Sequence, residues 1–352
     1  MLALLKEKIL TEPTKMITYA KFIELVLYHS ERGYYMRPIE KVGRKGDFIT
    51  TSNISDIYGR IIAKWFLKLQ KEHGLPPTVC EIGAGTGRFA AAFIDEWRNN
   101  SSEALRYYII ETSPYHRKIQ KEILPYEDCV TQVENIEDLK PFNGFIFSNE
   151  LFDALPVHVI EKKNGKLMEV MVSFEDNQLV EKLSPLNNVK ILEFLIESGL
   201  DLQENQRIEI PLQMEEMIRR ISSSLERGFM VTVDYGYTNE EWMEPIHREG
   251  SLRGYFKHEQ VNNVLLNPGE MDITTHIHFD SFIRIGEKHG LKLLSKQRQD
   301  EFLLSIGILQ ELEDHYDPNP FSEIGRRNRS IRSLIVPSGL SAYFHAIIQS
   351  KE

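Results

Sequence analysis

The sequence predicts an α/β fold in which a mainly parallel sheet carries helices on both faces. Three features indicate this fold. Short apolar runs alternate with amphipathic helical segments from Thr78 onwards, which is the pattern of a parallel sheet with crossover helices. A glycine-rich turn lies between the first run and the first helix, where the backbone must turn tightly. Two runs, 291–299 and 301–309, follow each other directly near the end, so we expect the sheet to finish in an antiparallel pair.

The N-terminal part is predicted to be largely helical. An apolar face at helical spacing runs through 1–36 and ends near Gly33. Residues 42–55 are rich in glycine, serine and threonine, which predicts an irregular loop. A strongly amphipathic helix follows from Asp56 to His73. We therefore expect 1–74 to form a helical cap with its loop.

The core of the fold is expected from about residue 75 to residue 310. Its strands are predicted at 78–82, 106–111, 129–133 and 144–150, with helices at 89–97 and 113–123. After an interruption, a helix at 214–226 and a strand at 229–236 restore the alternation, and another helix is predicted at 279–290. Residues 311–352 are expected to form an extension that packs on the core.

Two stretches interrupt this alternation and are predicted to be insertions. The first, at about 156–206, contains two β-like runs around Asn164-Gly165, the strongest short-range signal for a hairpin. The second, at about 237–279, is poorly periodic and contains several prolines and glycines. Neither stretch is expected to belong to the main sheet.

Composition narrows the class of protein. The 352 residues include 42 Lys+Arg against 52 Asp+Glu, a formal charge of −10, which disfavours a binder of nucleic-acid backbones. A hydrophobic content of 41% excludes wholesale disorder. The two cysteines, Cys80 and Cys129, are too few for a disulfide scaffold or a zinc cluster built on cysteine.

A cytoplasmic location of bacterial type is expected. The sequence has no apolar run of the ~18–20 residues that span a membrane, so no membrane insertion is predicted. The N-terminus lacks a signal-peptide stretch, and Glu7 and Glu12 argue against a mitochondrial transit sequence.

The segment from Glu81 to Gly87 is the strongest local signal for a ligand. Gly83, Gly85 and Gly87 would let a ligand touch the backbone, but Arg88 stands where a dinucleotide fingerprint has a further glycine. The G-x-G-x-G spacing is typical of sheets that bind S-adenosylmethionine, and so is an antiparallel final pair in a seven-stranded sheet. The alternative is a glycine turn without a ligand.

Acidic and polar residues follow the next two predicted strands. Glu111 could accept hydrogen bonds from both ribose hydroxyls of an adenosyl group, or it could be a solvated carboxylate at a strand end. Asn135 and Ile136 could supply a polar contact and an apolar wall for adenine.

The fourth predicted strand leads into a carboxylate-rich turn. Asn149 and Glu150 should face the methyl donor, because ligands of such sheets sit beyond the carboxyl ends of the strands. Together with Asp153, Glu150 could bind a guanidinium in a bidentate fork. Alternatively, Asn149 could orient an amide or amine acceptor, or these side chains could cap the following turn.

Taken together, these segments resemble the MidA family of class I S-adenosylmethionine-dependent methyltransferases, which includes a mitochondrial arginine methyltransferase needed to assemble respiratory complex I. The resemblance runs almost end to end. It rests on Gly33–Tyr35, Gly46–Thr50, Glu81–Gly87, Glu111–Pro114, Asn149–Pro156, Asp234–Gly236, Leu252–Tyr255 and Asp272–His276. Asn53, Ala84, Thr86 and His278 depart from the family pattern. The loss of acidic residues at Asn53 and His278 affects the expected acceptor more than the donor.

The resemblance implies a seven-stranded core, a donor site and an acceptor side. Asp47, Phe48 and Thr50 are implied as contacts of the methionine end of S-adenosylmethionine, under the N-terminal cap. The insertions are implied to form the substrate-binding lobe. The acceptor-side candidates are Asp234, Arg253, Tyr255 and His276.

The expected function is methyl transfer to an arginine nitrogen of a protein, with Glu150, Asn149 and Asp153 as the catalytic candidates. By resemblance the substrate could be a respiratory-complex subunit. The alternatives are a small-molecule methyltransferase and an assembly factor that binds the donor with little catalysis. No metal is expected, because His276 and His278 lack the carboxylate spacing that would complete a site. The basic run 326–332 predicts either a docking face or a solvated helix face.

Overall fold

The computed structural model describes residues 1–39, 56–126, 128–257, 259–313, 322–336 and 343–352. The chain divides into two compact units. Unit 1 comprises Met1–Phe48, Phe152–Ile218 and Gly236–Ile285, and unit 2 comprises Ile49–Leu151, Arg219–Tyr235 and Gly286–Glu352. Both predicted insertions therefore fall wholly within unit 1. The domain limits proposed from the sequence follow chain order and stay a prediction.

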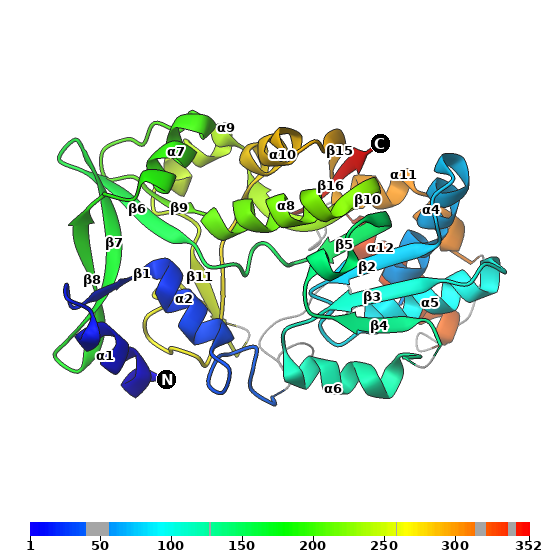
Figure 1. The fold of residues 1–352 in the computed structure, drawn as a ribbon, viewed down its shortest axis with the longest axis horizontal. Coiled ribbons are helices and arrows are strands. Elements are labelled where there is room, and N and C mark those ends of the chain that lie inside the picture. Colours follow the sequence, from blue (N-terminus) through cyan, green and yellow to red (C-terminus); the bar gives the residue numbers. More distant parts are fainter. Residues whose placement is uncertain (40–55, 127, 258, 314–321, 337–342) are drawn as a thin grey trace. The chain divides into compact units, whose positions relative to one another are not determined.

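Unit 2 is built on a mainly parallel sheet (Figure 1). Its strands lie in the order β4-β3-β2-β5-β10-β16-β15. Their bounds are β2 Thr78–Ile82, β3 Arg106–Ile110, β4 Val130–Val133, β5 Phe142–Asn149, β10 Leu225–Tyr237, β15 Lys292–Arg298 and β16 Phe344–Lys351. Strands β4, β3, β2, β5 and β10 are parallel to one another, whereas β16 runs antiparallel to both β10 and β15.

The α/β prediction is confirmed, whereas the predicted count of seven strands is not. The short strand β14 (Ile277–His278) pairs with the last two residues of β10 in unit 1, so the hydrogen-bonded sheet has eight strands in the described part of the chain. The predicted antiparallel ending is present, but the strand predicted at 301–309 is wrong. That run forms helix α11 (Gln299–Ser305) and a 3₁₀ turn, and the antiparallel strand is β16. A short apolar run fits either a strand or a buried helix, so periodicity alone cannot separate them.

The helices of unit 2 are α4 (Ile57–His73), α5 (Arg88–Asn100), α6 (Pro114–Ile123), α11 and α12 (Glu323–Ile335), with the end of α8 (Leu212–Ser224). Helices α4 and α5 approach closely because Gly59 has no side chain: a Cβ there would lie 2.7 Å from the Phe89 carbonyl oxygen. Buried aromatic rings fill the space between these helices and the sheet. They include Phe66, Phe93, Trp97, Phe145 and Phe147.

Unit 1 contains two further sheets. In the larger, β1 (Met16–Thr18), β7 (Lys166–Glu175), β6 (His158–Lys163) and β9 (Arg207–Ile210) lie in that order, and β8 (Gln178–Pro185) pairs with β7. In the smaller, β11 (Arg253–Phe256) lies between β12 (Glu259–Val261) and β13 (Asp272–Thr274). The predicted hairpin is confirmed, since Asn164 and Gly165 join β6 to β7 with φ values of 52° and 71°.

The helices of unit 1 are α1 (Leu2–Thr11), α2 (Tyr19–Tyr28), α7 (Val189–Ser198), α9 (Asn239–Trp242) and most of α8 and α10 (Phe279–Lys288). The prediction of helix throughout 1–36 is wrong at β1, and α2 already ends at Tyr28. Three residues are too few for an alternating pattern to stand out, and Thr18 directly caps α2 by accepting from the Lys21 N–H at 3.1 Å. No described helix is long and apolar enough to cross a membrane.

Candidate active site

The parallel strands of unit 2 end in one row, which brings the predicted donor residues to the same edge. Ile82 of β2 pairs with Ile110 of β3 and with Ser148 of β5, and Ile110 pairs with Val133 of β4. Gly83, Glu111 and Asn149 therefore lie at or just beyond this row. Ligands of doubly wound sheets bind at such a carboxyl edge.

The glycine loop after β2 adopts a backbone that favours glycine. Gly83, Gly85 and Gly87 have φ values of 77°, 52° and 83°, a region that side chains disfavour. A Cβ on Gly83 or Gly87 would press on Leu151 or Gln120, whereas a Cβ on Gly85 would meet no atom of the described residues within 4 Å. The loop is thus packed against side chains at Gly83 and Gly87 and open at Gly85, its middle, where a ligand could approach the backbone.

Glu111 holds this glycine loop in place through hydrogen bonds. Its Oε2 accepts a hydrogen bond from the Gly85 N–H at 2.8 Å, and its Oε1 accepts from the Ser113 N–H at 2.7 Å. A carboxylate offers about four lone-pair positions, so these bonds leave acceptor capacity for ribose hydroxyls. The solvated alternative does not describe Glu111, since its side chain is buried.

Glu81, on β2, is buried, although the sequence predicts that it contacts the cofactor. Its Oε2 accepts a hydrogen bond from the Tyr107 hydroxyl at 2.7 Å. Burial, offset in part by that hydrogen bond, raises the pKa of Glu81 to about 8. A direct contact between Glu81 and the cofactor remains a prediction.

Ile136 and Asn135, the two residues predicted to contact adenine, have different environments in the structure. Ile136 is buried. Asn135 is exposed and caps the 3₁₀ turn that follows β4, in a reciprocal capping box with Asp138. Its Oδ1 also accepts from Arg220 at 3.1 Å. Asn135 therefore has a structural role, and its contact with adenine stays a prediction.

Glu150 has an unusual backbone at the end of β5. Its φ is 50°, in the left-handed region that non-glycine residues rarely occupy outside functional or strained sites. The Glu150 N–H donates to the Val233 carbonyl at 2.9 Å, and the Asn149 amide donates to Glu150 Oε1 at 2.8 Å. The carboxylate is half-buried. Burial and then the Glu150 charge raise the pKa of Tyr58, whose hydroxyl lies 3.5 Å from Asn149 Oδ1.

Three of the acceptor-side candidates lie in unit 1. An Arg253 Nη atom lies 3.4 Å from both ring nitrogens of His276, and its guanidinium lies 5.9 Å from the Tyr255 ring. Burial and then the charges of Arg253 and His247 lower the pKa of His276 to about 2, so the ring is neutral. It stacks on Tyr237 with ring centroids 4.1 Å apart.

The other candidates are distributed between the two units. Asp153 is buried in unit 1, where its backbone carbonyl accepts from the Thr275 N–H at 3.0 Å. Asp234 is fully buried on β10 in unit 2, and its Oδ1 accepts from the Tyr235 N–H at 3.0 Å. Asp47, Phe48 and Thr50, like Asn53, lie outside the described residues.

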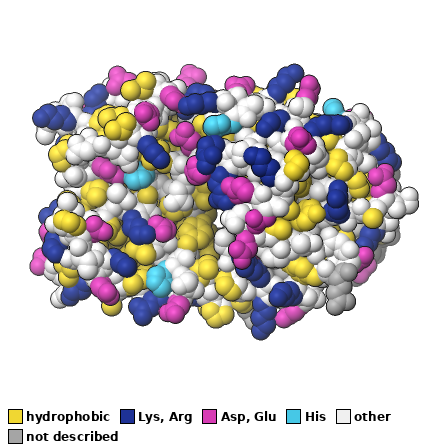
Figure 2. All heavy atoms as spheres, viewed as in Figure 1, with side chains coloured by type: hydrophobic (Ala, Val, Ile, Leu, Met, Phe, Trp, Pro, Cys, Tyr) yellow, Lys and Arg dark blue, Asp and Glu magenta, His cyan; other side chains and the backbone are white. Residues whose placement is uncertain are grey.

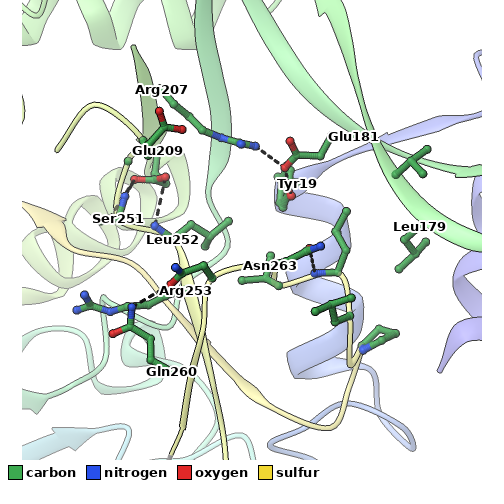
Figure 3. Close-up of a pocket in the computed structure, with 18 of the residues that line it drawn as sticks. Tyr19, Leu179, Glu181, Arg207, Glu209, Ser251, Leu252, Arg253, Gln260 and Asn263 are labelled. Carbon is green, nitrogen blue, oxygen red and sulfur yellow. Dashed lines mark hydrogen bonds and ion pairs between the residues drawn. The ribbon is translucent and has the colours of Figure 1, made fainter. Parts of the chain in front are cut away.

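Arg253 also lines a cavity of about 1010 Å³ in unit 1 (Figure 3). Four consecutive residues of β8, 178–181, form part of its wall. Because alternate side chains of a strand point to opposite faces, lining by consecutive residues means that the strand presents its edge. Glu209 forms part of the wall and accepts from the Ser251 N–H at 2.9 Å and from the Leu252 N–H at 3.3 Å.

The residues at the carboxyl edge of unit 2 fit the ribose of an adenosyl ligand. The open middle of the glycine loop and the remaining acceptor capacity of Glu111 would accommodate a ribose, and the buried Ile136 lies in the 3₁₀ turn that follows β4. This donor set is the chemistry that the sequence predicts.

The comparisons decide the family. The model of the family described as "Putative S-adenosyl-L-methionine-dependent methyltransferase" matches residues 61–296. The chain belongs to this family. Its structure is similar to that of a Burkholderia thailandensis protein bound to S-adenosyl-homocysteine, with a TM-score of 0.89 and 26% identity over 99% of this chain and 91% of the other. The predicted fold family and cofactor are therefore confirmed: the methyltransferase uses S-adenosyl-L-methionine as its donor.

Curated relatives of this methyltransferase include two mitochondrial proteins. The mouse protein arginine methyltransferase NDUFAF7 is 27% identical over 84% of this chain and 72% of its own length. The Drosophila melanogaster homolog of NDUFAF7, also called a protein arginine methyltransferase, is 26% identical over 81% of this chain and 70% of its own length.

Several polar contacts of the methyltransferase were not predicted. Tyr19 donates to Glu181, which Arg207 also contacts, and all three line the unit 1 cavity. Tyr35 donates to Asp272, and burial followed by that carboxylate raises the pKa of Tyr35. These partners lie far apart in the chain, so no local sequence pattern marks them. Among the described residues, no group of three or more His, Cys, Asp or Glu side chains could hold a metal ion.

We expect the buried carboxyl of Glu81 to make stability depend on pH. Because the folded pKa of about 8 lies above the usual value of 4.5, the folded state keeps a proton that the unfolded chain has released. Stability should thus fall as pH rises through this window, by about 1.4 kcal/mol per pH unit. Glu81→Gln should remove this slope. The free energy of unfolding of the variant, relative to that of the natural protein, should therefore rise between about pH 5 and pH 8.

Urea unfolding at several pH values measures this difference. Glu122→Gln, which changes an exposed carboxyl on α6, is the control and should differ from the natural protein by a constant amount. A constant difference for Glu81→Gln as well would show that Glu81 does not titrate in this range.

Proposed function

We propose that this methyltransferase methylates an arginine side chain of a protein substrate. The observation that carries the proposal is Glu150, a carboxylate held in a left-handed backbone at the carboxyl end of β5 and hydrogen-bonded by Asn149. A backbone conformation of this kind costs free energy, which is consistent with a functional demand on the side chain. The names of the relatives support the same acceptor.

The chemistry needs positioning more than covalent catalysis. The bound donor supplies an activated methyl group; its S–CH₃ bond breaks as an N–CH₃ bond forms, and the acceptor nitrogen then loses a proton. Glu150 would bind the guanidinium in the orientation that points one nitrogen at the methyl group, because carboxylate and guanidinium pair as a fork. Asn149 would hold Glu150, and Asp153 would add a second negative charge. Asp234, Tyr255 and His276 would serve on the acceptor side.

The cavity of unit 1 supports a protein rather than a small molecule as acceptor. Its volume of about 1010 Å³ is at the upper limit of about 1,000 Å³ for small-molecule sites. Strand β8 pairs only with β7 among the described strands, and an exposed strand edge can bind an extended peptide by main-chain hydrogen bonds. We therefore propose unit 1 as the substrate-binding lobe, with Arg253 as one of its contacts.

The finer parts of the donor site belong to the same proposal. Asp47, Phe48 and Thr50 would contact the methionine end of the donor beneath the N-terminal segment, and Asn135 the adenine. A cytoplasmic location and a respiratory-complex subunit as substrate rest on sequence patterns and resemblance.

Transfer of labelled methyl groups into an extract tests the acceptor. The extract comes from a strain that lacks this gene, and it receives S-adenosyl-L-methionine with either the natural protein or Glu150→Gln. We expect a labelled protein only with the natural protein, and methylarginine after hydrolysis of that protein. Label in small molecules alone would favour the small-molecule alternative. No transfer, despite calorimetric donor binding, would favour an assembly factor.

A further inference from the structure

A second cavity, in unit 2, has four arginines among its seven described lining residues. It has a volume of about 540 Å³. Its lining residues are Asp56, Ile57, Arg60, Arg88, Arg326, Arg327 and Ser330. Four guanidinium groups thus face one carboxylate in a protein whose formal charge is −10. On the face of the molecule in Figure 2, by contrast, positive and negative side chains are interspersed.

The arginines reach the cavity from three helices. Arg60 lies in the first turn of α4, Arg88 is the first residue of α5, and Arg326 and Arg327 belong to α12. The basic run noted in the sequence therefore does not only face solvent: two of its members join two arginines from distant parts of the chain. The first turns of α4 and α5 add the positive ends of two helix dipoles.

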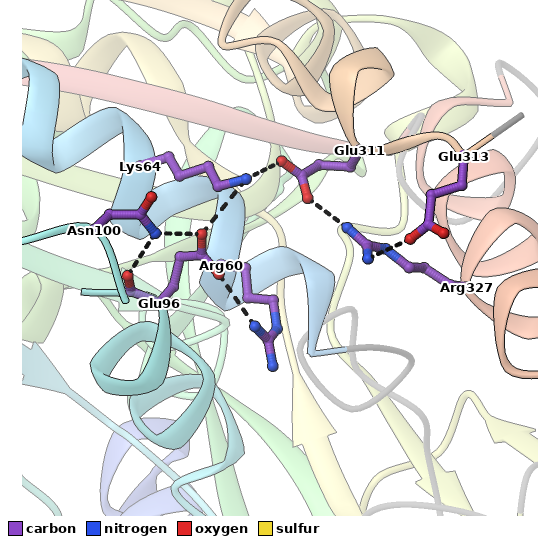
Figure 4. Close-up of polar contacts among 7 residues, drawn as sticks. All are labelled: Arg60, Lys64, Glu96, Asn100, Glu311, Glu313 and Arg327. Atoms are coloured by element: carbon purple, nitrogen blue, oxygen red, sulfur yellow. Dashed lines mark hydrogen bonds and ion pairs between the residues drawn. The ribbon is translucent and has the colours of Figure 1, made fainter. Parts of the chain in front are cut away.

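A network of ion pairs holds part of this cluster in place (Figure 4). Arg60 pairs with Glu96 at 3.1 Å, and Arg327 pairs with Glu311 at 2.7 Å and with Glu313 at 2.8 Å. Lys64 contacts both Glu96 and Glu311, so it links α4 to the segment before α12. These bonds orient Arg60 and Arg327 before any ligand arrives.

Arg88 and Arg326 are the other two arginines of the lining. Arg88 lies 3.7 Å from Asp56, and both side chains are largely exposed, so this pair is weak. Arg326 is exposed, and its side chain has no hydrogen bond or ion pair to another described residue. Each guanidinium carries five N–H donors. Arg326 therefore presents N–H donors that no described carboxylate accepts.

We propose that this cavity binds a small polyanion that carries phosphate groups. The described lining holds four arginines and one aspartate, and the cluster keeps a net charge of +1 when Lys64 and the three carboxylates that pair with Arg60 and Arg327 are counted as well. A phosphate group carries about −1.5 to −2 charges and three acceptor oxygens, and its geometry matches the guanidinium fork. A volume of about 540 Å³ lies within the range of about 300–1,000 Å³ for small-ligand sites. This site is independent of which acceptor the enzyme methylates.

Calorimetric titration with pyrophosphate tests the proposal on the full chain. We expect binding to the natural protein, roughly tenfold weaker binding to Arg326→Ala, and still weaker binding to Arg326→Glu. Arg326→Lys, which keeps the charge and loses the fork, should fall between the natural protein and Arg326→Ala. The matched control is Arg329→Ala, because Arg329 is an exposed arginine on the same helix that does not line the cavity. Its affinity should be unchanged.

Three outcomes would overturn the proposal. One is the absence of pyrophosphate binding to the natural protein. The second is an equal loss in Arg326→Ala and Arg329→Ala, which would indicate general attraction to a basic helix. The third is tighter binding of a polyglutamate peptide than of pyrophosphate, with the same dependence on Arg326, which would assign the cavity to an acidic protein segment. Thermal unfolding of each variant without ligand shows whether a loss of binding reflects a loss of folding.

Discussion

Replacing Glu150 with glutamine is expected to lower kcat for methyl transfer by about 10²–10³-fold, the range seen when one preorganised electrostatic contact to a transition state is removed. Donor affinity should change by less than about twofold, because the proposed partner of Glu150 is the acceptor. The glutamine would keep the size of the side chain and lose the charge that pairs with a guanidinium. Initial rates with the labelled protein substrate and calorimetric titration of the donor measure the two effects separately.

The backbone at Glu150 makes a second variant informative. Since φ is 50° there, Glu150→Gly should relieve about 1–2 kcal/mol of left-handed strain. The greater freedom of glycine in the unfolded chain opposes this gain by about 0.4–1 kcal/mol. Glu150→Gly should therefore be no less stable than the natural protein while being as inactive as Glu150→Gln.

A control and a contradicting result complete this test. Glu122→Gln changes an exposed carboxylate of the same unit and should leave both kcat and donor affinity unchanged. Turnover within about threefold of the natural protein in Glu150→Gln, well short of the drop expected for a lost transition-state contact, would remove Glu150 from the mechanism. A large loss of donor affinity would instead reassign Glu150 to the donor site.

The carboxyl edge of the sheet could be predicted because its signals are local. Strands β2, β3 and β4 are short runs followed directly by Gly83, Glu111 and Glu134, and β5 ends in Asn149. Parallel strands bring such ends together. The register that aligns Ile82, Ile110 and Val133 is the three-dimensional form of that pattern. The loop conformation at Gly83, Gly85 and Gly87 likewise follows from residue type.

What could not be predicted depends on contacts between distant segments. Strand β16 lies between β10 and β15, although its residues follow β15 by more than forty positions and a closer apolar run competes with it. The pairing of Tyr19 with Glu181 joins residues 162 positions apart. The capping role of Asn135 is local, but a capping residue and an adenine contact require the same polar side chain, so the sequence favours neither.

The arginine cavity illustrates the same limit. The run 326–332 is visible in the sequence, and a charged helix face is most often solvated. Only the packing of α12 near the first turns of α4 and α5 brings Arg326 and Arg327 into one cavity with Arg60 and Arg88. Charge that appears dispersed along the chain is therefore concentrated at one place in the fold.

Glu111→Gln is expected to weaken donor binding by roughly 10- to 150-fold, because bonds to a charged group contribute about 1.5–3 kcal/mol. The glutamine would keep one acceptor oxygen and turn its NH₂ group toward a backbone N–H that now donates to the carboxylate. Either Gly85 or Ser113 would lose its acceptor, and the glycine loop would no longer be held at its open middle. Calorimetric titration of the natural protein and the variant with S-adenosyl-homocysteine measures the loss.

The result would also separate two roles of Glu111. If the carboxylate only holds the loop in place, the variant without ligand should be less stable than the natural protein. Its affinity for adenosine, which lacks the amino-acid end, should then fall by the same factor as its affinity for the full ligand. If it also binds the ribose, a donor analogue without the ribose hydroxyls should lose less affinity in Glu111→Gln than S-adenosyl-homocysteine does, since only the loss through the loop remains. Unchanged affinity for S-adenosyl-homocysteine in Glu111→Gln, with Glu122→Gln as the reference, would mean that Glu111 neither binds the ribose nor controls the loop. The ribose would then have to be held by groups other than the carboxylate after β3.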